Sequence, residues 1–267
     1  MRLLVVSDLH ILGPEDPVYL SLLDLLRHRT HPGDEVVLAG DIFDLFVGSK
    51  AVFRDRYAGF FSTLKEAGTR GVNLHYIEGN HDFLLRKAFE EIPRFHLYPH
   101  EVKLELAGKR FFVAHGDTVD RSDYGYRALR VLFRSPLMKT LVKVTPGKVL
   151  DSIGKRSSEA SRGSRPRMLA ELPLERAEAL RRRFRSYAAE KLGQGYDYVV
   201  LGHCHDLDEM RFKVGDRQGQ YVNVGFPRVH GSFLSWEPGE ALISREAMPV
   251  GNSSKFKDNQ GTPPRRV

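Results

Sequence analysis

The sequence predicts an α/β fold, with either one mixed sheet or a sandwich of two sheets, flanked by helices. Short apolar runs recur along the chain, and each ends in Gly or in a polar residue, as β-strands do. Helical patterns lie between the first three of these runs, which indicates βαβ units. Further strand-like runs follow one another closely near the end of the chain, which indicates antiparallel strands there.

Five apolar runs account for the predicted core strands. They are rich in Val, Leu and aromatic residues, and they cover residues 2–7, 35–40, 72–79, 110–116 and 197–203. Amphipathic patterns predict helices at 17–29 and 57–68, between the first three strands. The late runs GQYVNVG, GSFLSWE and EALISRE predict a series of antiparallel strands.

A different pattern at about 122–168 predicts a helical insertion between two core strands. Two basic amphipathic helices are expected within it, at 124–134 and 136–144. A further helix at 173–193 leads back to the last core strand. The second helix has clear end signals, because Ser135 and Pro136 stand where an N-cap and a first helical residue belong, and the sequence Thr-Pro-Gly follows it.

The chain of 267 residues is long enough for one large α/β domain. We expect a single domain at 1–250 that includes the insertion at 122–168. Residues 251–267 are polar and rich in Gly, Pro and Ser, and we expect them to form a disordered tail.

The positive charge of the chain belongs to one segment. Residues 121–167 hold twelve Lys and Arg against three Asp and Glu, a local net charge of +9, whereas the whole chain carries +7. Such a segment indicates an anionic partner, which could be phosphate groups, a membrane surface or nucleic acid. The alternative is a basic helix face that only meets solvent.

The cysteine content and the N-terminus predict the cellular compartment. Cys204 is the single cysteine, so the chain forms no internal disulfide, which suits a reducing environment. The apolar run LLVV near the start is too short for a signal peptide, and no uncharged apolar run reaches the length of a membrane span. We therefore expect a cytoplasmic protein.

Residues of the metal-ligand type follow each of the five predicted core strands. They lie in the fragments SDLH, GDIFD, GNHD, AHGD and GHCH, which hold Asp8, His10, Asp41, Asp44, Asn80, His81, His115, His203 and His205. Side chains just past the carboxyl ends of strands converge on one crevice. In both D-x-H and H-x-H we expect the two side chains on one face of an extended strand end. The glycines that precede Asp41, Asn80 and His203 allow tight turns and close approach.

The predicted ligands are carboxylates, imidazoles and one amide oxygen, a set that suits Mn²⁺, Fe or Zn²⁺ better than a thiolate zinc site does. Two ions could share a bridging carboxylate and act together on a phosphorus centre. Each fragment alone has an ordinary explanation as an N-cap, a turn or a structural histidine. Five fragments in order, each at a strand end, favour the metal site. The other six histidines are interpreted as ordinary, with His230 the one most worth checking because it lies near a loop.

At these motifs the sequence resembles the calcineurin-like metallophosphoesterases. Their pattern of D-x-H, G-D-x-x-D, G-N-H-D/E, H and G-H-x-H is complete here between residues 8 and 205. The resemblance implies a β-sandwich of two mixed sheets flanked by helices, an α+β arrangement, with a dinuclear metal site. It assigns one metal to Asp8, His10, Asp41 and His205, and the other to Asp41, Asn80, His115 and His203, with Asp41 as the bridge.

The resemblance also implies which residues act on the substrate. His81 would be a catalytic histidine that binds no metal and that steadies the transition state or protonates the leaving oxygen. Asp82 has two open interpretations, orienting His81 or starting a helix.

The segments GDIFDLFVG, GNHDFLLRKAFE, HGDTVDRSDYGYRALRVLFRSP and SSEASRGSR narrow the resemblance to the bacterial UDP-2,3-diacylglucosamine hydrolases, over about residues 1–235. Those enzymes cleave the pyrophosphate of UDP-2,3-diacylglucosamine to UMP and 2,3-diacylglucosamine 1-phosphate (lipid X) in lipid A biosynthesis, and they carry a basic and apolar helical lid at this place. The resemblance implies two divalent cations, with Mn²⁺ expected and Fe or Zn²⁺ as alternatives. It also implies a peripheral enzyme at the cytoplasmic face of the inner membrane. We expect no nucleic-acid partner, because the charges of the basic segment alternate with an aliphatic stripe and stacking aromatics are few there. The sequence leaves the oligomeric state open.

The predicted lid would bind both parts of such a substrate. Its apolar stripe would form a pocket for the acyl chains and comprises Leu129, Leu132, Phe133, Leu137, Met138, Leu141 and Val142. By resemblance the glucosamine-phosphate part would contact Asp123, Tyr126, Ser157, Arg162 and Arg165, since guanidinium groups pair well with phosphate oxygens. Asn80, His81 and His203 would also touch the substrate. The alternative is that the stripe packs on the core and the charges meet solvent.

The mechanistic hypothesis is in-line attack of a metal-bridging hydroxide on the α-phosphorus, with the lipid 1-phosphate leaving with the help of His81. One departure bears on the substrate, because many of these hydrolases have Arg where this chain has His81. A different phosphoesterase activity is therefore the alternative: a nucleotide pyrophosphatase, a phosphodiesterase or a protein phosphatase. A non-catalytic scaffold with the same fold is a third hypothesis, although the motifs have lost no ligand.

Overall fold

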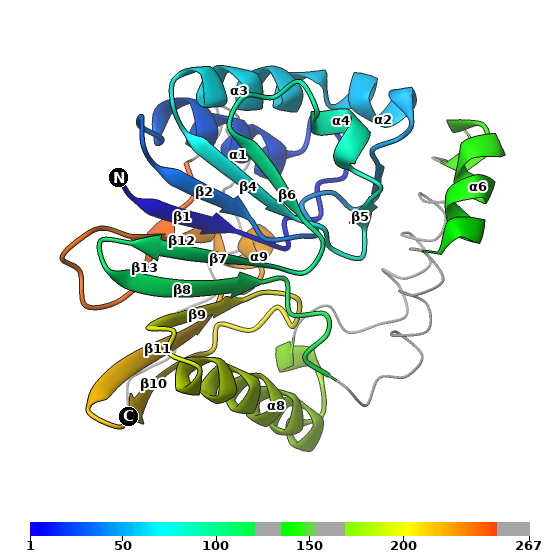
Figure 1. The fold of residues 1–267 in the computed structure, drawn as a ribbon. Coiled ribbons are helices and arrows are strands. Elements are labelled where there is room, and N and C mark those ends of the chain that lie inside the picture. The colour runs from blue at the N-terminus through cyan, green and yellow to red at the C-terminus, as the bar shows by residue number, and fades with distance from the viewer. Residues whose placement is uncertain (121–134, 148, 151, 153–168, 250–267) are drawn as a thin grey trace.

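The computed structural model describes residues 1–120, 135–147, 149–150, 152 and 169–249 (Figure 1). The predicted tail at 251–267 and most of the predicted insertion lie outside these residues, so the proposed division of the chain into domain, lid and tail stays a prediction.

The first sheet has the strand order β13-β12-β1-β2-β4-β6. Its strands are β1 (Leu3–Val6), β2 (Glu35–Leu38), β4 (Asn73–Ile77), β6 (Phe95–Tyr98), β12 (Ser232–Trp236) and β13 (Ser244–Ala247). The strands from β1 to β6 pair in parallel, as βαβ units require, whereas β12 and β13 are antiparallel to their neighbours.

The second sheet has the order β10-β11-β9-β8-β7. Its strands are β7 (Glu101–Leu106), β8 (Lys109–Ala114), β9 (Tyr198–Leu201), β10 (Glu209–Val214) and β11 (Arg217–Asn223). The central strand β9 is parallel to both β8 and β11, whereas the outer strands pair antiparallel. Two short strands, β3 (Phe46–Val47) and β5 (Asp82–Phe83), form a separate parallel pair.

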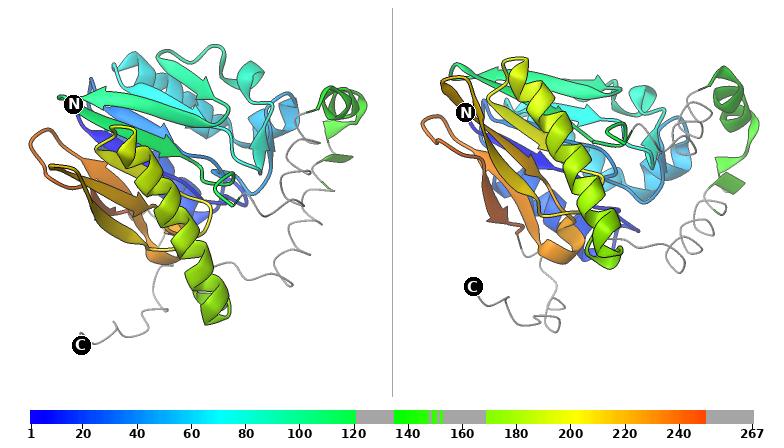
Figure 2. Two further views of the ribbon diagram at one scale, coloured as in Figure 1. Left: turned by 60° about the horizontal axis from the view of Figure 1, so that its bottom comes forward. Right: turned by 90° about the horizontal axis from the view of Figure 1, so that it is seen from below.

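The two sheets face each other, and helices cover both outer surfaces (Figures 1 and 2). An apolar cluster that includes Val5, Val37 and Val200 fills the space between the sheets. Helices α1 (Pro17–His28) and α3 (Ala58–Thr69) pack on the first sheet, and α8 (Leu174–Gly193) packs on the second. This is the predicted sandwich of two mixed sheets flanked by helices.

The remaining helices are short or lie at the edge of the core. They are α2 (Ala51–Arg56), α4 (Arg86–Phe89), α6 (Pro136–Val144), α9 (Pro227–His230) and a 3₁₀ turn, η1 (Leu169–Glu171). None of the helices in the described part of the chain is long and apolar enough to span a membrane.

The helix-end signals in the sequence act as predicted. The Ser135 side chain accepts a hydrogen bond from the Met138 backbone at the start of α6, Pro136 occupies the first turn, and the helix ends at Thr145. The apolar residues of α6 differ in their exposure. Val142 is buried and Met138 packs against the core of the first sheet, whereas Leu141 is 52% exposed.

One strand prediction was wrong in part. The late runs were expected to form a series of antiparallel strands, and β12 and β13 do pair antiparallel in the first sheet, but β11 lies in the second sheet, parallel to β9. The short helix α9 separates β11 from β12, and it carries the chain from one sheet to the other. The strands β6, β7 and β10 were not predicted, because each is half exposed and lacks a continuous apolar run.

Candidate metal centre

The candidate ligands lie where the carboxyl ends of the two sheets meet. Strands β1, β2 and β4 of the first sheet lead to Asp8, Asp41 and Asn80, while β8 and β9 of the second lead to His115 and to the GHCH motif. The expected crevice therefore has one wall from each sheet. This explains why the motifs are spread over most of the chain.

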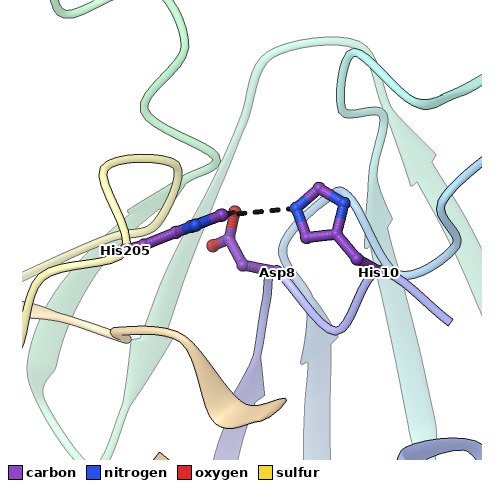
Figure 3. A group of neighbouring side chains, drawn as sticks. All are labelled: Asp8, His10 and His205. Carbon is purple, nitrogen blue, oxygen red and sulfur yellow. Dashed lines mark hydrogen bonds and ion pairs between the residues drawn. The ribbon is translucent and has the colours of Figure 1, made fainter. Parts of the chain in front are cut away.

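Asp8, His10 and His205 form the first cluster (Figure 3). One ligand atom from each lies within 4.8 Å of the others. The Nε2 atoms of His10 and His205 are 3.3 Å apart, and Nε2 of His205 is 3.3 Å from Oδ1 of Asp8. The aromatic ring of Phe226 stacks on His205 with a centroid distance of 4.4 Å, which fixes the plane of that imidazole.

Asp41, His115 and His203 form the second cluster. Nε2 of His115 lies 3.4 Å from Oδ2 of Asp41 and 3.3 Å from Nδ1 of His203. The side-chain oxygen of Asn80 joins them, 3.3 Å from the same His115 nitrogen. Nδ1 of His115 lies 3.0 Å from the carbonyl oxygen of Ala39, an arrangement in which Nδ1 donates and Nε2 points into the cluster.

Asp41 is a member of the second cluster and also faces the first. Its Oδ1 accepts hydrogen bonds from the backbone N–H groups of Asn80 and His81, at 2.9 and 3.0 Å. Its Oδ2 faces His115 of the second cluster and lies 3.9 Å from Nε2 of His10 in the first. The residue that the resemblance names as the bridge therefore stands between the two groups of ligands.

The electrostatics of the site favour ionised carboxylates. Burial raises the pKa of Asp8, but the close contact with His205 and the charges of His115 and His205 outweigh it and lower the pKa to about 2. Burial also opposes ionisation of Asp41, and the charges of His115 and His81 bring its pKa well below the usual range. Burial lowers the pKa of His10 to about 3 and of His203 to about 4, so both imidazoles are neutral at pH 7.

These donors suit a divalent cation. Oδ1 of Asp8 is buried and accepts no hydrogen bond from the described residues. Imidazole nitrogens face each other at 3.3 Å in both clusters, and ionised carboxylates stand beside them. Carboxylate, imidazole and amide oxygen donors are the ligands that Mn²⁺, Fe and Zn²⁺ accept. The residues present therefore fit the metal that the motifs imply.

The backbone at the candidate ligands was predicted wrongly. Extended strand ends were expected, but Asp8, His10, Asp41, His203 and His205 all have φ between 45° and 70°, in the left-handed region. They make up five of the eight non-glycine residues with positive φ in the described ranges. Such strain persists where surrounding contacts enforce it, and it gathers at functional sites.

The predicted roles of the glycines are confirmed, because each one gives room to a ligand from another motif. A Cβ on Gly40 would lie 2.7 Å from His115, one on Gly79 would lie 2.1 Å from Oδ1 of Asp41, and one on Gly202 would lie 2.4 Å from Oδ2 of Asp8. Only glycine allows the loops to approach so closely.

Asp82 has a role that the sequence interpretation missed. Its carboxylate accepts hydrogen bonds from the backbone of Gly79 (2.7 Å) and Ile42 (3.0 Å) and from the hydroxyl of Tyr76 (2.6 Å). It therefore ties the GNHD loop to the GDIFD loop. Helix α4 begins only at Arg86, so Asp82 starts no helix, and its hydrogen bonds go to these groups rather than to His81.

His81 lies at the edge of the first cluster. Its Nδ1 is 2.7 Å from the carbonyl oxygen of Asp44, and its ring meets that of His10 at a centroid distance of 4.9 Å. Burial lowers its pKa, but the charge of Asp41 and the contact with Asp44 outweigh burial and raise it.

Two further residues support the site. Arg228 was not identified from the sequence, and His230 was interpreted as ordinary, although it was the one marked for checking. Arg228 donates to the carbonyl oxygen of His10 at 2.8 Å and to the carboxylate of Asp16 at 2.6 Å. His230 accepts a hydrogen bond from the backbone of Phe226 at 3.1 Å, so it supports the ring that stacks on His205. No motif marks them, because both lie beyond the last predicted fragment.

The predicted contacts to the glucosamine-phosphate part, Asp123, Tyr126, Ser157, Arg162 and Arg165, lie outside the described residues, as do Leu129, Leu132 and Phe133 of the apolar stripe. These assignments stay predictions.

A two-sheet sandwich with clustered carboxylates and imidazoles at the carboxyl ends of its strands is suited to metal-dependent hydrolysis. Residues 1–207 match the model of the calcineurin-like phosphoesterase family, and the chain belongs to that family. It is therefore a hydrolase that acts on phosphorus bonds, in a family that binds divalent metals.

Relatives in several bacteria carry a more specific name. A UDP-2,3-diacylglucosamine hydrolase of Photorhabdus laumondii is 29% identical over 77% of this chain and 82% of its own length. An enzyme of the same name from Pectobacterium carotovorum is 24% identical over 89% of this chain and 96% of its own. One from Escherichia coli is 32% identical over 55% of this chain and 60% of its own.

Proposed function

We propose that this protein hydrolyses the pyrophosphate bond of UDP-2,3-diacylglucosamine and releases UMP and 2,3-diacylglucosamine 1-phosphate. The family supports phosphoester chemistry, and relatives named for this substrate match across much of the chain. The observation that carries the chemistry is the position of Asp41 between two clusters of ligands. The assignment of the substrate rests on the named relatives and on the basic and apolar segment between β8 and α8.

Two divalent cations would occupy the site, with Asp8, His10, Asp41 and His205 around one and Asp41, Asn80, His115 and His203 around the other. When bound, such ions polarise phosphoryl oxygens and make water more acidic. Mn²⁺ is the expected metal, with Fe or Zn²⁺ as alternatives. Asp41 holds the two halves of the site together, because the backbone of the GNHD loop fixes one of its oxygens.

His81 would act on the leaving group. Its Nδ1 donates to the Asp44 carbonyl, so the ring has one orientation and its Nε2 can carry the proton that the leaving oxygen requires. The raised pKa of His81 keeps that proton available near neutral pH.

The lid would receive the acyl chains and would meet the cytoplasmic face of the inner membrane. Leu141 and Val144 of α6 expose 52% and 71% of their surface, although neighbouring residues of the same helix pack on the core. An exposed apolar face on a basic segment suits an anionic lipid surface.

A second phosphoesterase substrate has one observation in its favour. His81 stands where many hydrolases of this kind have Arg, so the phosphate beside it would lose a bidentate partner. A broader phosphodiesterase is therefore the alternative. A non-catalytic scaffold would have lost ligands, whereas every predicted one is present.

The test is to incubate the protein and Mn²⁺ with UDP-2,3-diacylglucosamine and, separately, with a simple aryl phosphodiester. Chromatography measures UMP, and absorbance measures the aryl alcohol. We expect UMP from the lipid nucleotide and negligible release from the aryl diester. Cleavage of the aryl diester alone would contradict the proposal and support the alternative.

A further inference from the structure

Two ion pairs join helix α8 to the loop that carries His203 and His205. The guanidinium of Arg181 makes two hydrogen bonds with Asp206, at 2.6 and 2.8 Å, and Arg185 pairs with Asp208 through two nitrogens. Arg181 and Arg185 are one helical turn apart, so they lie on the same face of α8. Asp206 directly follows His205, and both carboxylates are buried.

These pairs differ from ordinary surface ion pairs. The Asp206 and Asp208 side chains are only 9% and 5% exposed, so each would be a buried charge without its arginine. The next arginine, Arg182, instead pairs with Glu178 of its own helix, and both are more than half exposed. The four arginines between 181 and 185 therefore have different partners, and Arg181 and Arg185 are the ones that pair with the loop.

The loop needs external support because its backbone is strained. His203 and His205 have φ of 70° and 53°, which is unfavourable for residues other than glycine. At the start of the loop, the side chain of Asn223, the last residue of β11, donates to the carbonyl oxygen of Gly202 at 3.1 Å. On the far side of the histidines, Arg181 and Arg185 fix the two aspartates that follow. The histidines are thus held between two anchors.

We propose that Arg181 and Arg185 are positioning residues that keep His203 and His205 in the geometry that binds metal. The inference rests on the proposed role of these histidines as ligands. Arg181 pairs with Asp206 and Arg185 pairs with Asp208, which follow His205 by one and three residues. Figure 2 shows α8 running along the second sheet, on which it packs.

The test measures Mn²⁺ binding by isothermal titration calorimetry on the full chain, with no substrate present. Arg181→Gln removes both the positive charge and the guanidinium that makes two hydrogen bonds with Asp206. Arg181→Lys keeps the charge and removes only that paired geometry. Arg182→Gln, one residue along, makes the same charge change and is the matched control. We expect Arg181→Gln to weaken Mn²⁺ binding by roughly 10- to 100-fold, as the loss of a group supporting a metal ligand does. Arg182→Gln should bind as the wild type does.

A second readout separates positioning from loss of fold. Circular dichroism should show both variants folded, and saturating Mn²⁺ should restore most of the kcat of Arg181→Gln while KM for substrate stays unchanged. If Arg181→Gln does not fold, Arg181→Lys decides, with an expected loss of affinity between those of the wild type and the glutamine variant. Wild-type affinity in a folded Arg181 variant would overturn the proposal. Absence of Mn²⁺ binding in the wild type would instead contradict the proposed function.

Discussion

Oδ2 of Asp41 lies 3.4 Å from Nε2 of His115, so a carboxylate from the first sheet meets an imidazole from the second at the centre of the site. The two residues follow β2 and β8, which belong to different sheets. The contact joins the two layers of the sandwich where the candidate ligands gather. Its loss should affect both metals, which sets Asp41 apart from a ligand that serves one.

Asp41→Asn should lower kcat/KM by more than about 100-fold, the upper range for a residue that only supports a metal ligand. The amide keeps the shape of the side chain, but it removes the charge that both clusters face. Asp24→Asn, on the surface of α1, is the matched control and should retain wild-type activity. Full activity in Asp41→Asn would contradict the proposed bridge.

Gly79→Ala should abolish activity. The added Cβ would lie 2.1 Å from Oδ1 of Asp41, so the GNHD loop must move away from the bridging carboxylate. Gly193→Ala is the comparison, because a Cβ there meets nothing within 4 Å. Gly193 ends α8, where Ala favours the helix by up to about 1 kcal/mol. Steady-state kinetics and thermal unfolding of both variants check the prediction, and an active Gly79→Ala protein would refute the close approach.

The buried carboxyl of Asp82 should make the stability of the metal-free protein depend on pH. Burial and the charge of Asp41 raise its pKa from the ordinary value of 3.8 to about 6. A raised pKa means that the folded protein holds the proton more tightly, so this contribution to stability is present at low pH and is lost as the pH rises through about 6. The size of the effect is about 3 kcal/mol.

The measurement is urea unfolding of chelator-treated wild type and Asp82→Asn at pH 4 and pH 7. Between these values the wild type should lose about 2.4 kcal/mol of unfolding free energy relative to the variant, because the amide does not titrate. The loss is smaller than the full effect because the unfolded carboxyl is already partly ionised at pH 4. A difference between the two proteins that does not change with pH would show that Asp82 has an ordinary pKa.

Metal removal should separate activity from fold. Dialysis against a chelator should abolish turnover, and Mn²⁺ should restore it, while the circular dichroism spectrum of the sandwich changes little because both cores are apolar. Added Mn²⁺ should raise the unfolding free energy, by about 2.7 kcal/mol per site at 100 times its Kd. Turnover that persists in metal-free protein would exclude the proposed role of the site.

The sequence predicted the layers of the fold because continuous apolar runs mark buried strands. β1, β2, β4, β8 and β9 each lie within a few residues of the predicted runs, and helices α1, α3, α6 and α8 do as well. The half-exposed strands escaped prediction because they lack a continuous apolar run. β10, for example, alternates polar and apolar residues along the sequence EMRFKV. The sheet to which β11 belongs depends on contacts distant in sequence, which no local pattern carries.

The site was predicted as a set of residues but not as a geometry. The motifs named the ligands that gather around Asp41, yet they gave the wrong backbone, because left-handed residues such as His205 are fixed by contacts from elsewhere. Phe226, Arg228 and the α8 arginines supply these contacts, and nothing in their local sequence distinguishes them from ordinary core or surface residues.

The central claim is that Asp41 bridges two metal ions held between the two sheets. It is tested most directly by anomalous X-ray scattering from crystals of the Mn²⁺-loaded protein. We predict two peaks about 3.5–4 Å apart, one beside His10 and His205 and the other beside His115 and His203, with Asp41 between them. A single peak, or two peaks that do not flank Asp41, would contradict the claim.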